Sequence, residues 1–337
     1  IVDNYGDAGV CWRLARSLAS IHGQEVRIFC DDLPTLNLLA SGVDPAIKQK
    51  IDMQPWDASH SNARHPVQTP DVVIEAFGCE LPERYLAGLF IASIKPIIIN
   101  LEYLSAEPWI TEFHGKASPQ SHGIPKYFFF PGFQEEVGGL LLDPIPAEGN
   151  LTDNNIPNDL KNVWSNLRPG AKRISVFCYP GAPLKKWLED LGSLGEEVDI
   201  LLAHGHAEQL NLYGEQPISL PKNLQLLSMP FVSQDDYDWV LSQCDFNIVR
   251  GEDSFVRAQL AGKPFIWHIY PQEDRAHEVK LAAFLDLYLE EASQELRLAT
   301  IAAMTWAMPR EWFGKLEVWN THAKGWRTHL LEKQADG

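Results

Sequence analysis

CDFNIVRGEDSFVRAQLAGKPFIWHIYPQED, residues 244–274, holds the pattern that decides the fold. Residues 245–249 predict a strand, and residues 250–253 then turn the chain into a helix expected over 254–260. A glycine stops that helix, and residues 263–269 return at once to a second apolar strand. A strand, a helix and another strand in so short a space are typical of the βαβ unit, in which the two strands run parallel.

Six other stretches rich in Ile, Val, Leu and Phe predict further strands of the same kind. They are EVRIFC (25–30), DVVIEAF (71–77), PIIINL (96–101), RISVFCY (173–179), VDILLAH (198–204) and LQLLSMPF (224–231). Runs that are apolar on both faces and separated by helix-length segments indicate parallel strands covered by helices. The fold class is therefore α/β, and no repeat of fixed period is visible in the sequence.

The strands fall into two series, which predicts two domains of ordinary size. Between the series lies DPIPAEGNLTDNNIPND (143–159), a stretch with three Pro and four Asn that is the best linker candidate. We therefore expect one domain over residues 1–150 and a second over 160–310. The pattern is helical from Gln294 onward, and a helical tail over 311–337 is expected to pack back on the first domain.

Composition and charge exclude several classes of protein. The longest apolar runs fall far short of the ~20 residues that cross a bilayer, so no membrane association is expected. The 28 basic and 45 acidic residues give a net charge of −17, which argues against broad nucleic-acid binding. Five scattered cysteines without a C-x-x-C pair indicate neither a disulfide framework nor a zinc site, and a reducing cytoplasm fits best.

The chain opens IVDNYGDAGV, with two carboxylates, Asp3 and Asp7, in one tight turn between an expected strand and a helix. Val10, Leu14 and Leu18 recur at helical spacing and predict the inner face of that helix. Asp7 then lies near the N-cap, where its simplest role is to accept a backbone N–H.

Capping does not explain Asp3, which ends a predicted parallel strand, where open α/β sheets place their ligand crevice. A dinucleotide-binding loop needs G-x-G-x-x-G, but only Gly6 and Gly9 are present, and Asp7 would repel a pyrophosphate. Two acids at such an edge can instead bind a cation or take up a proton. The sequence therefore predicts an acceptor site here.

The turn at residues 250–253 predicts an anion site in the second domain. The amino end of the 254–260 helix, with Arg250 beside it and the hydroxyl of Ser254, suits a diphosphate. Glu252 and Asp253 would repel that anion unless they turn away, so they are expected to cap the helix or to accept hydrogen bonds from a sugar. Turns before helices favour such residues in any case, so a purely structural role stays open.

Two further strand ends carry groups that can recognise a base. Phe177 and Tyr179 follow one predicted strand, and Phe231 and Gln234 follow another. Aromatic rings stack on bases, and a Gln amide both donates and accepts hydrogen bonds. Core packing is the alternative for each ring taken singly.

No metal site is predicted. The H-x-H pair at 204–206 lacks a third ligand at a recognisable spacing. Helix capping and solvated loops explain the acid pairs at 31–32 and 235–236 more simply than metal binding does.

DNYGDAGVCWRLAR (3–16) and RGEDSFVRAQLAGKPFIWHIYPQ (250–272) closely resemble the bacterial elongation factor P arginine rhamnosyltransferase family, and the order of strands and helices agrees over essentially the whole length. The resemblance implies a GT-B fold, with two Rossmann-like domains facing one another across a cleft and a C-terminal helix crossing back to the first. It also implies inverting transfer of L-rhamnose from dTDP-β-L-rhamnose to an arginine of elongation factor P, without a metal or other cofactor.

The resemblance further implies roles for individual residues. The family's two amino-terminal catalytic aspartates fall on Asp3 and Asp7, which we read as orienting partner and general base. Its catalytic or donor-positioning glutamate falls on Glu252. The donor-binding positions are Phe177, Tyr179, Phe231, Gln234, Arg250, Gly251, Asp253, Ser254 and Tyr270.

Two other hypotheses are compatible with the residues alone. A GT-B transferase that uses another nucleotide sugar and a small-molecule or glycan acceptor would keep the donor site but would not need the Asp3/Asp7 pair. A non-catalytic nucleotide-sugar-binding protein would need neither acid.

Overall fold

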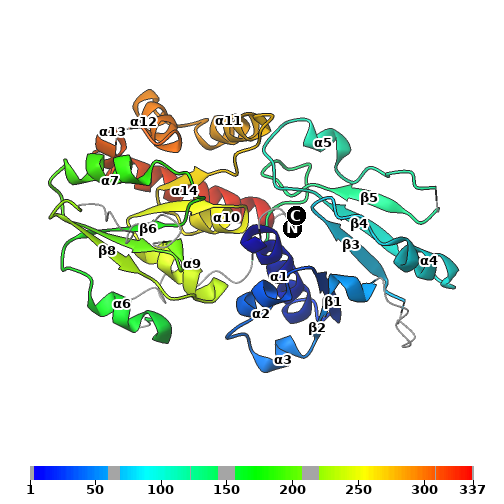
Figure 1. The fold of residues 1–337 in the computed structure, drawn as a ribbon. Coiled ribbons are helices and arrows are strands. Elements are labelled where there is room, and N and C mark those ends of the chain that lie inside the picture. Colours follow the sequence, from blue (N-terminus) through cyan, green and yellow to red (C-terminus); the bar gives the residue numbers. More distant parts are fainter. Residues whose placement is uncertain are drawn as a thin grey trace. The chain divides into compact units, whose positions relative to one another are not determined.

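The computed structural model describes residues 4–59, 69–121, 123–142, 156–206, 220–307 and 309–335. Its contacts divide the chain into two compact units, residues 1–143 and 144–337 (Figure 1). Both units alternate helices with parallel strands, which confirms the α/β class. Each unit is described by itself.

Within the described residues of the first unit, the strands form two parallel sheets. Its helices are α1 (Asn4–Ser20), α2 (Leu33–Leu39), α3 (Pro45–Lys48), η1 (Trp56–Ser59), α4 (Glu83–Ile91) and α5 (Ile110–Phe113). Its strands are β1 (Val26–Cys30), β2 (Ile51–Pro55), β3 (Val72–Ala76), β4 (Ile97–Leu101) and β5 (Lys126–Phe129). β1 pairs with β2, and β3, β4 and β5 pair in that order. The carboxyl ends of β3 and β4 therefore lie side by side.

Helix α1 differs from its prediction in two respects. It begins at Asn4, so Asp7 lies buried in the first turn rather than at the N-cap. Its most deeply buried row is Ala8, Trp12, Ala15 and Ala19, whereas the predicted row of Val10, Leu14 and Leu18 is half-buried. Two apolar rows run along this helix, and the alanines of the buried row let the helix approach its neighbours closely around one large indole.

The eight strands predicted from residue 25 onward are present within a few residues of their expected ends, whereas the strand predicted to end at Asp3 lies outside the described residues. Two further strands, β2 and β5, were not predicted. β2 carries Asp52 and Gln54 among its five residues, and β5 is only four residues long. Register explains the acid in β2: Asp52 lies opposite Arg27 of β1, and their side chains form an ion pair at 2.6 Å. A short strand whose polar groups are satisfied by a neighbouring strand leaves little apolar pattern.

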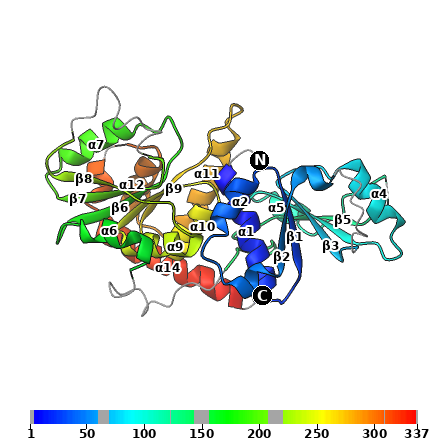
Figure 2. The ribbon, with the colours of Figure 1, turned by 60° about the horizontal axis from the view of Figure 1, so that its bottom comes forward.

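The second unit has one five-stranded parallel sheet. Its strands are β6 (Lys172–Val176), β7 (Val198–Leu202), β8 (Leu224–Ser228), β9 (Phe246–Arg250) and β10 (Phe265–His268). Its helices are η4 (Asn158–Leu160), α6 (Lys161–Ser165), α7 (Leu184–Gly192), α9 (Gln234–Gln243), α10 (Asp253–Leu260), α11 (Ala276–Tyr288), α12 (Gln294–Met304), α13 (Pro309–Phe313) and α14 (Leu316–Ala335). Figure 2 shows α7 and α12 over one face of the sheet and α6 and α9 over the other.

The strand order of this sheet is β10-β9-β6-β7-β8. The chain moves from β6 outward through β7 to β8 and then crosses to the other side of β6 to form β9. The direction of winding reverses between β6 and β9, and open α/β sheets bind their ligands at the carboxyl ends of the two strands that flank such a reversal. Of the residues that the sequence predicts to bind the donor, Phe177 and Tyr179 lie in the loop after β6, Gly251 follows β9, and Asp253 and Ser254 begin α10.

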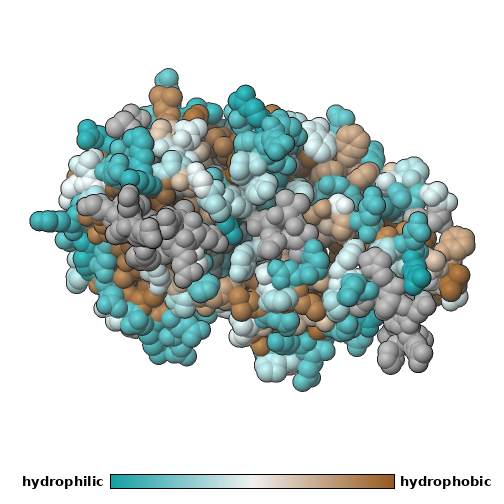
Figure 3. Space-filling model, in the orientation of Figure 1, coloured by the Kyte–Doolittle hydropathy of each residue, from teal (hydrophilic) through white to brown (hydrophobic). Residues whose placement is uncertain are grey.

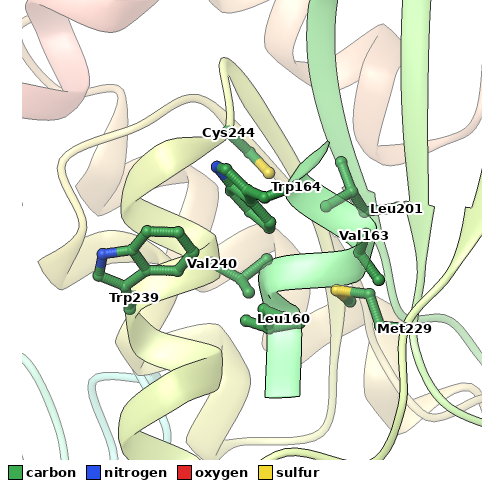
Figure 4. Packing of buried hydrophobic residues seen from close by; sticks show 8 residues of the cluster. All are labelled: Leu160, Val163, Trp164, Leu201, Met229, Trp239, Val240 and Cys244. Carbon is green, nitrogen blue, oxygen red and sulfur yellow. The ribbon is translucent and has the colours of Figure 1, made fainter. Parts of the chain in front are cut away.

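Large side chains fill the space on both faces of the sheet. On one face, Trp164 of α6 and Trp239 of α9 pack with ring centroids 4.5 Å apart in the cluster drawn in Figure 4. On the other, the indole of Trp312 stacks on Phe246 of β9 at 4.2 Å and lies parallel to Trp187 of α7 at 6.4 Å. Burying aromatic rings of this size supplies much of the hydrophobic stabilisation of such a core.

The C-terminal helix α14 packs against α10 within the second unit. Trp326 donates its indole N–H to Gln259 Oε1 at 2.8 Å, and Arg327 Nε donates to the carbonyl of Leu260 at 2.8 Å. Gly262 follows α10 with φ +64°, a left-handed conformation that favours glycine, and a Cβ there would lie 3.0 Å from Cδ of Arg327. That the tail also packs on the first domain stays a prediction.

Hydrophilic and hydrophobic residues are interspersed over the face shown in Figure 3. The most exposed apolar side chains of the first unit include Ile91, at the end of α4, and Ile94 just beyond it, which are 83% and 79% exposed. Among the described residues, no helix is both long enough and apolar enough to cross a membrane.

Candidate functional site

Two histidines hold the backbone of the turn that follows β6. The N–H of Cys178 donates to His206 Nε2 at 2.8 Å, and the N–H of Tyr179 donates to His268 Nδ1 at 3.0 Å. His206 comes from just beyond β7 and His268 from the end of β10, so the turn is tied to strands on both sides. These two bonds fix the direction in which the side chains of Phe177 and Tyr179 leave the sheet.

Both histidines are neutral acceptors. Burial and, to a smaller extent, the charge of Arg250 lower the pKa of His206 to about 4 and that of His268 to about 4. A protonated ring would carry a hydrogen on the nitrogen that must accept the backbone N–H. The arrangement of the turn therefore depends on neutral imidazoles.

This dependence predicts acid sensitivity of the fold. Because the folded pKa values lie below the usual 6.5, the unfolded chain binds more protons between pH 6.5 and about 4, and stability falls as the pH drops through that window. The expected loss is about 1.4 kcal/mol for each unit of pKa shift. Urea unfolding at pH 7, 5.5 and 4.5 measures it. His206→Gln and His268→Gln, which keep an acceptor that does not titrate, should weaken the pH dependence of the free energy of unfolding. The same pH dependence in both variants as in the wild type would contradict this prediction.

Arg250, the last residue of β9, lies between the two rings. Its guanidinium carbon is 4.3 Å from the centroid of Phe177 and 4.8 Å from that of Tyr179, and Nη1 donates to the carbonyl of Cys178 at 3.3 Å. The side chain is buried, and its Nε has no hydrogen-bond partner among the described residues. Within the same part of the chain, no carboxylate forms an ion pair with it. A buried cation that protein acids leave uncompensated attracts an anion.

The residues after Arg250 lead into α10 and turn their acids toward other partners. Gly251 adopts φ +65°, a backbone conformation that suits glycine, and its carbonyl accepts from the Trp267 indole at 2.9 Å. Glu252 precedes the helix without capping it, and its carboxylate pairs with Lys280 of α11 at 2.7 Å. The predicted capping by Glu252 is therefore absent, because the carboxylate is drawn to that lysine.

Asp253 and Gln234 bind one another. Gln234 opens α9 and donates its side-chain amide to Asp253 Oδ2 at 3.1 Å. This bond ties the amino ends of α9 and α10 together. Ser254, the second residue of α10, is half-buried beside them. The free N–H groups of the first helical turn and the helix dipole favour an anion at this end.

The two other predicted aromatic residues, Tyr270 and Phe231, have different neighbours. Tyr270, beyond β10, is 43% exposed and meets the edge of Tyr179 at 5.2 Å. Phe231, beyond β8, is half-buried, and His204 meets it edge-on at 6.3 Å. The structure thus brings Phe177, Tyr179, Arg250 and Tyr270 into one cluster and gives Phe231 a separate neighbour.

If the Phe231 ring stacks on a nucleotide base, Phe231→Ala should weaken dTDP binding by about 1–3 kcal/mol. Calorimetric titration of the whole protein measures this. Phe313→Ala in α13 is the matched control, since that ring is also half-buried but packs against Trp312. Equal dTDP affinity in the wild type and Phe231→Ala would show that the ring contributes to packing and not to base stacking.

The acceptor residues lie in the first unit. Asp7 is buried in the first turn of α1, and the hydroxyl of Tyr103 donates to its Oδ2 at 3.4 Å. Asp3, its predicted partner, lies outside the described residues. Another buried acid of this unit, Glu75 of β3, forms an ion pair with Lys126 of β5. Because β4 lies between β3 and β5, this ion pair spans the middle strand of the three-stranded sheet.

Four residues with contacts to the site were not predicted from the sequence: His206, His268 and Lys280 in the second unit and Tyr103 in the first. His206 belongs to the H-x-H pair that was weighed only as a metal site, and its ring nitrogen is occupied by the backbone of Cys178. His268 lies near the end of the strand predicted over 263–269 and Tyr103 follows the one predicted over 96–101, so their position at strand ends was the available signal. Within the described residues, no group of three or more His, Cys, Asp or Glu side chains is placed to hold a metal ion.

Comparison with solved structures defines the class. The MurG structure from Acinetobacter baumannii is 15% identical and superposes with a TM-score of 0.51 over 96% of this chain and 92% of its own, a likeness of fold alone. The structure described as the structural basis for EarP-mediated arginine glycosylation of translation elongation factor EF-P is 28% identical, with a TM-score of 0.61 over 97% of this chain and 91% of its own. The fold is that of the GT-B glycosyltransferases.

The family follows from the sequence match. The model of the Elongation-Factor P (EF-P) rhamnosyltransferase EarP family matches residues 1–336. A protein-arginine rhamnosyltransferase of Pseudomonas putida is 39% identical over 354 aligned residues, which cover 97% of this chain and 92% of that relative. The chain belongs to the EarP family, as the two sequence motifs indicated, and it is a glycosyltransferase.

Proposed function

We propose that this protein transfers L-rhamnose from dTDP-β-L-rhamnose to an arginine side chain of translation elongation factor P, with inversion at the sugar carbon. The observation that carries the donor half is Arg250, a buried cation at the switch point of the second sheet with an aromatic ring on either side. The acceptor half is supported by the family match and by the acid at the start of α1.

The second unit holds the donor in this proposal. The diphosphate lies against Arg250 and the free N–H groups at the start of α10, which spread the charge that develops on the leaving dTDP. Tyr270 adds a hydroxyl at the rim, and Phe231 offers a ring for the thymine. Glu252, held by Lys280, accepts hydrogen bonds from sugar hydroxyls and so orients the anomeric carbon.

The first unit holds the acceptor. An arginine side chain has a pKa above 12, so at neutral pH its nitrogen lone pair is delocalised and it is a poor nucleophile. Asp3 and Asp7 bind the guanidinium, and Asp7 takes a proton as the nitrogen–carbon bond forms. The carbon–oxygen bond to dTDP breaks with its electron pair in the same step, which gives an α-linked rhamnosyl arginine.

No metal is required, because Arg250 and the helix amides neutralise the leaving group. The partner is elongation factor P and not a nucleic acid or a membrane. The cytoplasm is the compartment in which a translation factor is encountered.

Intact mass spectrometry of elongation factor P tests the proposal. Incubation with the enzyme and dTDP-rhamnose should add one deoxyhexosyl residue, and the addition should persist in EDTA. Acceptor protein in which the modified arginine is changed to lysine is the control. No addition from dTDP-rhamnose, with transfer from another nucleotide sugar or to another acceptor, would favour the alternative transferase. Binding of dTDP-rhamnose without transfer to any acceptor would favour the non-catalytic alternative.

A further inference from the structure

Two aromatic rings lie together at the carboxyl edge of the three-stranded sheet in the first unit. Phe77 directly follows β3, and Tyr103 comes two residues after β4. The strands are parallel neighbours, and the N–H of Phe77 extends the ladder by donating to the carbonyl of Leu101 at 2.8 Å. The two rings are stacked, with centroids 4.6 Å apart and planes at 21°. Both side chains are half-buried, so the pair forms part of the surface.

The backbone of Phe77 is strained. Its φ is +58°, in the left-handed region, and Gly78 follows at +71°. Glycine or asparagine adopts this conformation readily, whereas a bulky side chain pays a steric penalty. A turn selected for its backbone alone would not have phenylalanine at this position. We therefore infer that the aromatic ring itself is the reason for phenylalanine at this position. Strained backbone conformations of this kind are concentrated at functional sites.

The ring pair is continuous with the acid at the start of α1. The hydroxyl of Tyr103 donates to Asp7 Oδ2 at 3.4 Å. Three elements thus converge: the first turn of α1 brings a carboxylate, and the ends of β3 and β4 bring two rings. A carboxylate beside an aromatic surface is an arrangement that recognises a planar cation, because the ring face and the acid both attract positive charge.

We propose that Phe77 and Tyr103 form the binding surface for the acceptor guanidinium, which stacks against this ring pair while Asp7 holds its N–H edge. The inference rests on the proposed function and deepens it, because it assigns the residues that select the acceptor side chain. A guanidinium is planar and weakly hydrated, and it stacks on rings, whereas an ammonium is compact and strongly hydrated. The surface therefore favours arginine over lysine. Tyr103 acts in addition as a positioning residue for Asp7.

Two substitutions separate these roles in the rhamnosylation assay with elongation factor P. Phe77→Leu removes the ring but keeps apolar volume, and it should raise the acceptor KM about 3- to 30-fold with little change in kcat. Tyr103→Phe keeps the ring but removes the hydroxyl, and it should lower kcat more than it changes the acceptor KM. Neither should alter dTDP affinity. Phe77→Tyr, which restores a ring, should retain the acceptor KM of the wild type.

Phe29→Leu is the matched control for lost packing. Phe29 of β1 is also half-buried in the first unit and meets Tyr85 edge-on at 5.9 Å. It should lower the melting temperature without changing the acceptor KM. An acceptor KM that is unchanged in folded Phe77→Leu, or raised as much in Phe29→Leu, would overturn the inference. If Phe77→Leu does not fold, Tyr103→Leu serves as the ring-removing variant under the same criteria.

A binding measurement keeps this inference distinct from the proposed function. N-acetyl-arginine amide and N-acetyl-lysine amide are titrated against the wild type and Phe77→Leu by saturation-transfer NMR. The arginine probe should bind the wild type more tightly than the lysine probe, and Phe77→Leu should remove most of that difference. If the wild type modifies no elongation factor P, the proposed function fails. If the wild type does not prefer the arginine probe, the ring-pair surface fails.

Discussion

Asp7→Asn is expected to lower turnover by about 10²–10⁴-fold, the usual contribution of a general base. Asparagine has nearly the same shape as aspartate and a similar helix propensity, so α1 should form as before. It cannot accept the proton that the guanidinium must release. Donor affinity should remain that of the wild type, because Asp7 belongs to the first unit and the donor residues to the second.

The measurement is the single-turnover rate of rhamnosylation, taken together with dTDP affinity and melting temperature. Asp32→Asn is the matched control, since Asp32 caps α2 in the same unit by accepting from the Thr35 N–H at 3.0 Å, and asparagine caps equally well. That variant should keep its full rate. A full rate in Asp7→Asn would refute the base assignment, whereas a loss of both rate and melting temperature would call for Asp7→Glu to be compared at equal stability.

The predictable part of the fold is the part whose residues are apolar on both faces. β7 and β9 are buried along their whole length, and their sequences predicted parallel strands that are covered by helices. Asn247 is a polar residue in β9, but it can be buried there because its side chain accepts from Ser175 at 2.6 Å and donates to the carbonyl of Leu241 at 3.0 Å. β2 was missed because its acid is satisfied by a partner strand that sequence periodicity does not reveal.

The candidate site was predictable to the extent that its residues follow strands. Arg250, Phe177 and Tyr179 were found in this way, and the structure brings them together. The bonds of His206 and His268 to the turn after β6 join residues 28 and 89 positions apart, and no local pattern reveals such pairs. Likewise, the partner of Glu252 is Lys280, on a helix that lies beyond β10.

Arg250→Met is expected to lower dTDP affinity and turnover together, with turnover falling by about 10²–10³-fold, as when one preorganised donor to a developing charge is removed. The same change should leave the melting temperature unchanged or raise it. A buried cation without a carboxylate partner carries an uncompensated desolvation cost, and an apolar side chain of similar length fits between the two rings without that cost. A substitution that lowers turnover but does not lower the melting temperature identifies a residue that is retained for ligand binding and not for stability.

Comparing dTDP with thymidine makes this test specific to the diphosphate. The wild type should bind dTDP much more tightly than thymidine, and Arg250→Met should narrow that ratio by weakening dTDP alone. Lys172→Met is the control: it removes a cation from the amino end of β6, at the opposite edge of the same sheet, where Lys172 lies 3.6 Å from Asp245. It should leave the ratio intact. If Arg250→Met instead lowers the melting temperature and keeps the ratio, then Arg250 is a support for the Cys178 carbonyl, and the diphosphate binds elsewhere.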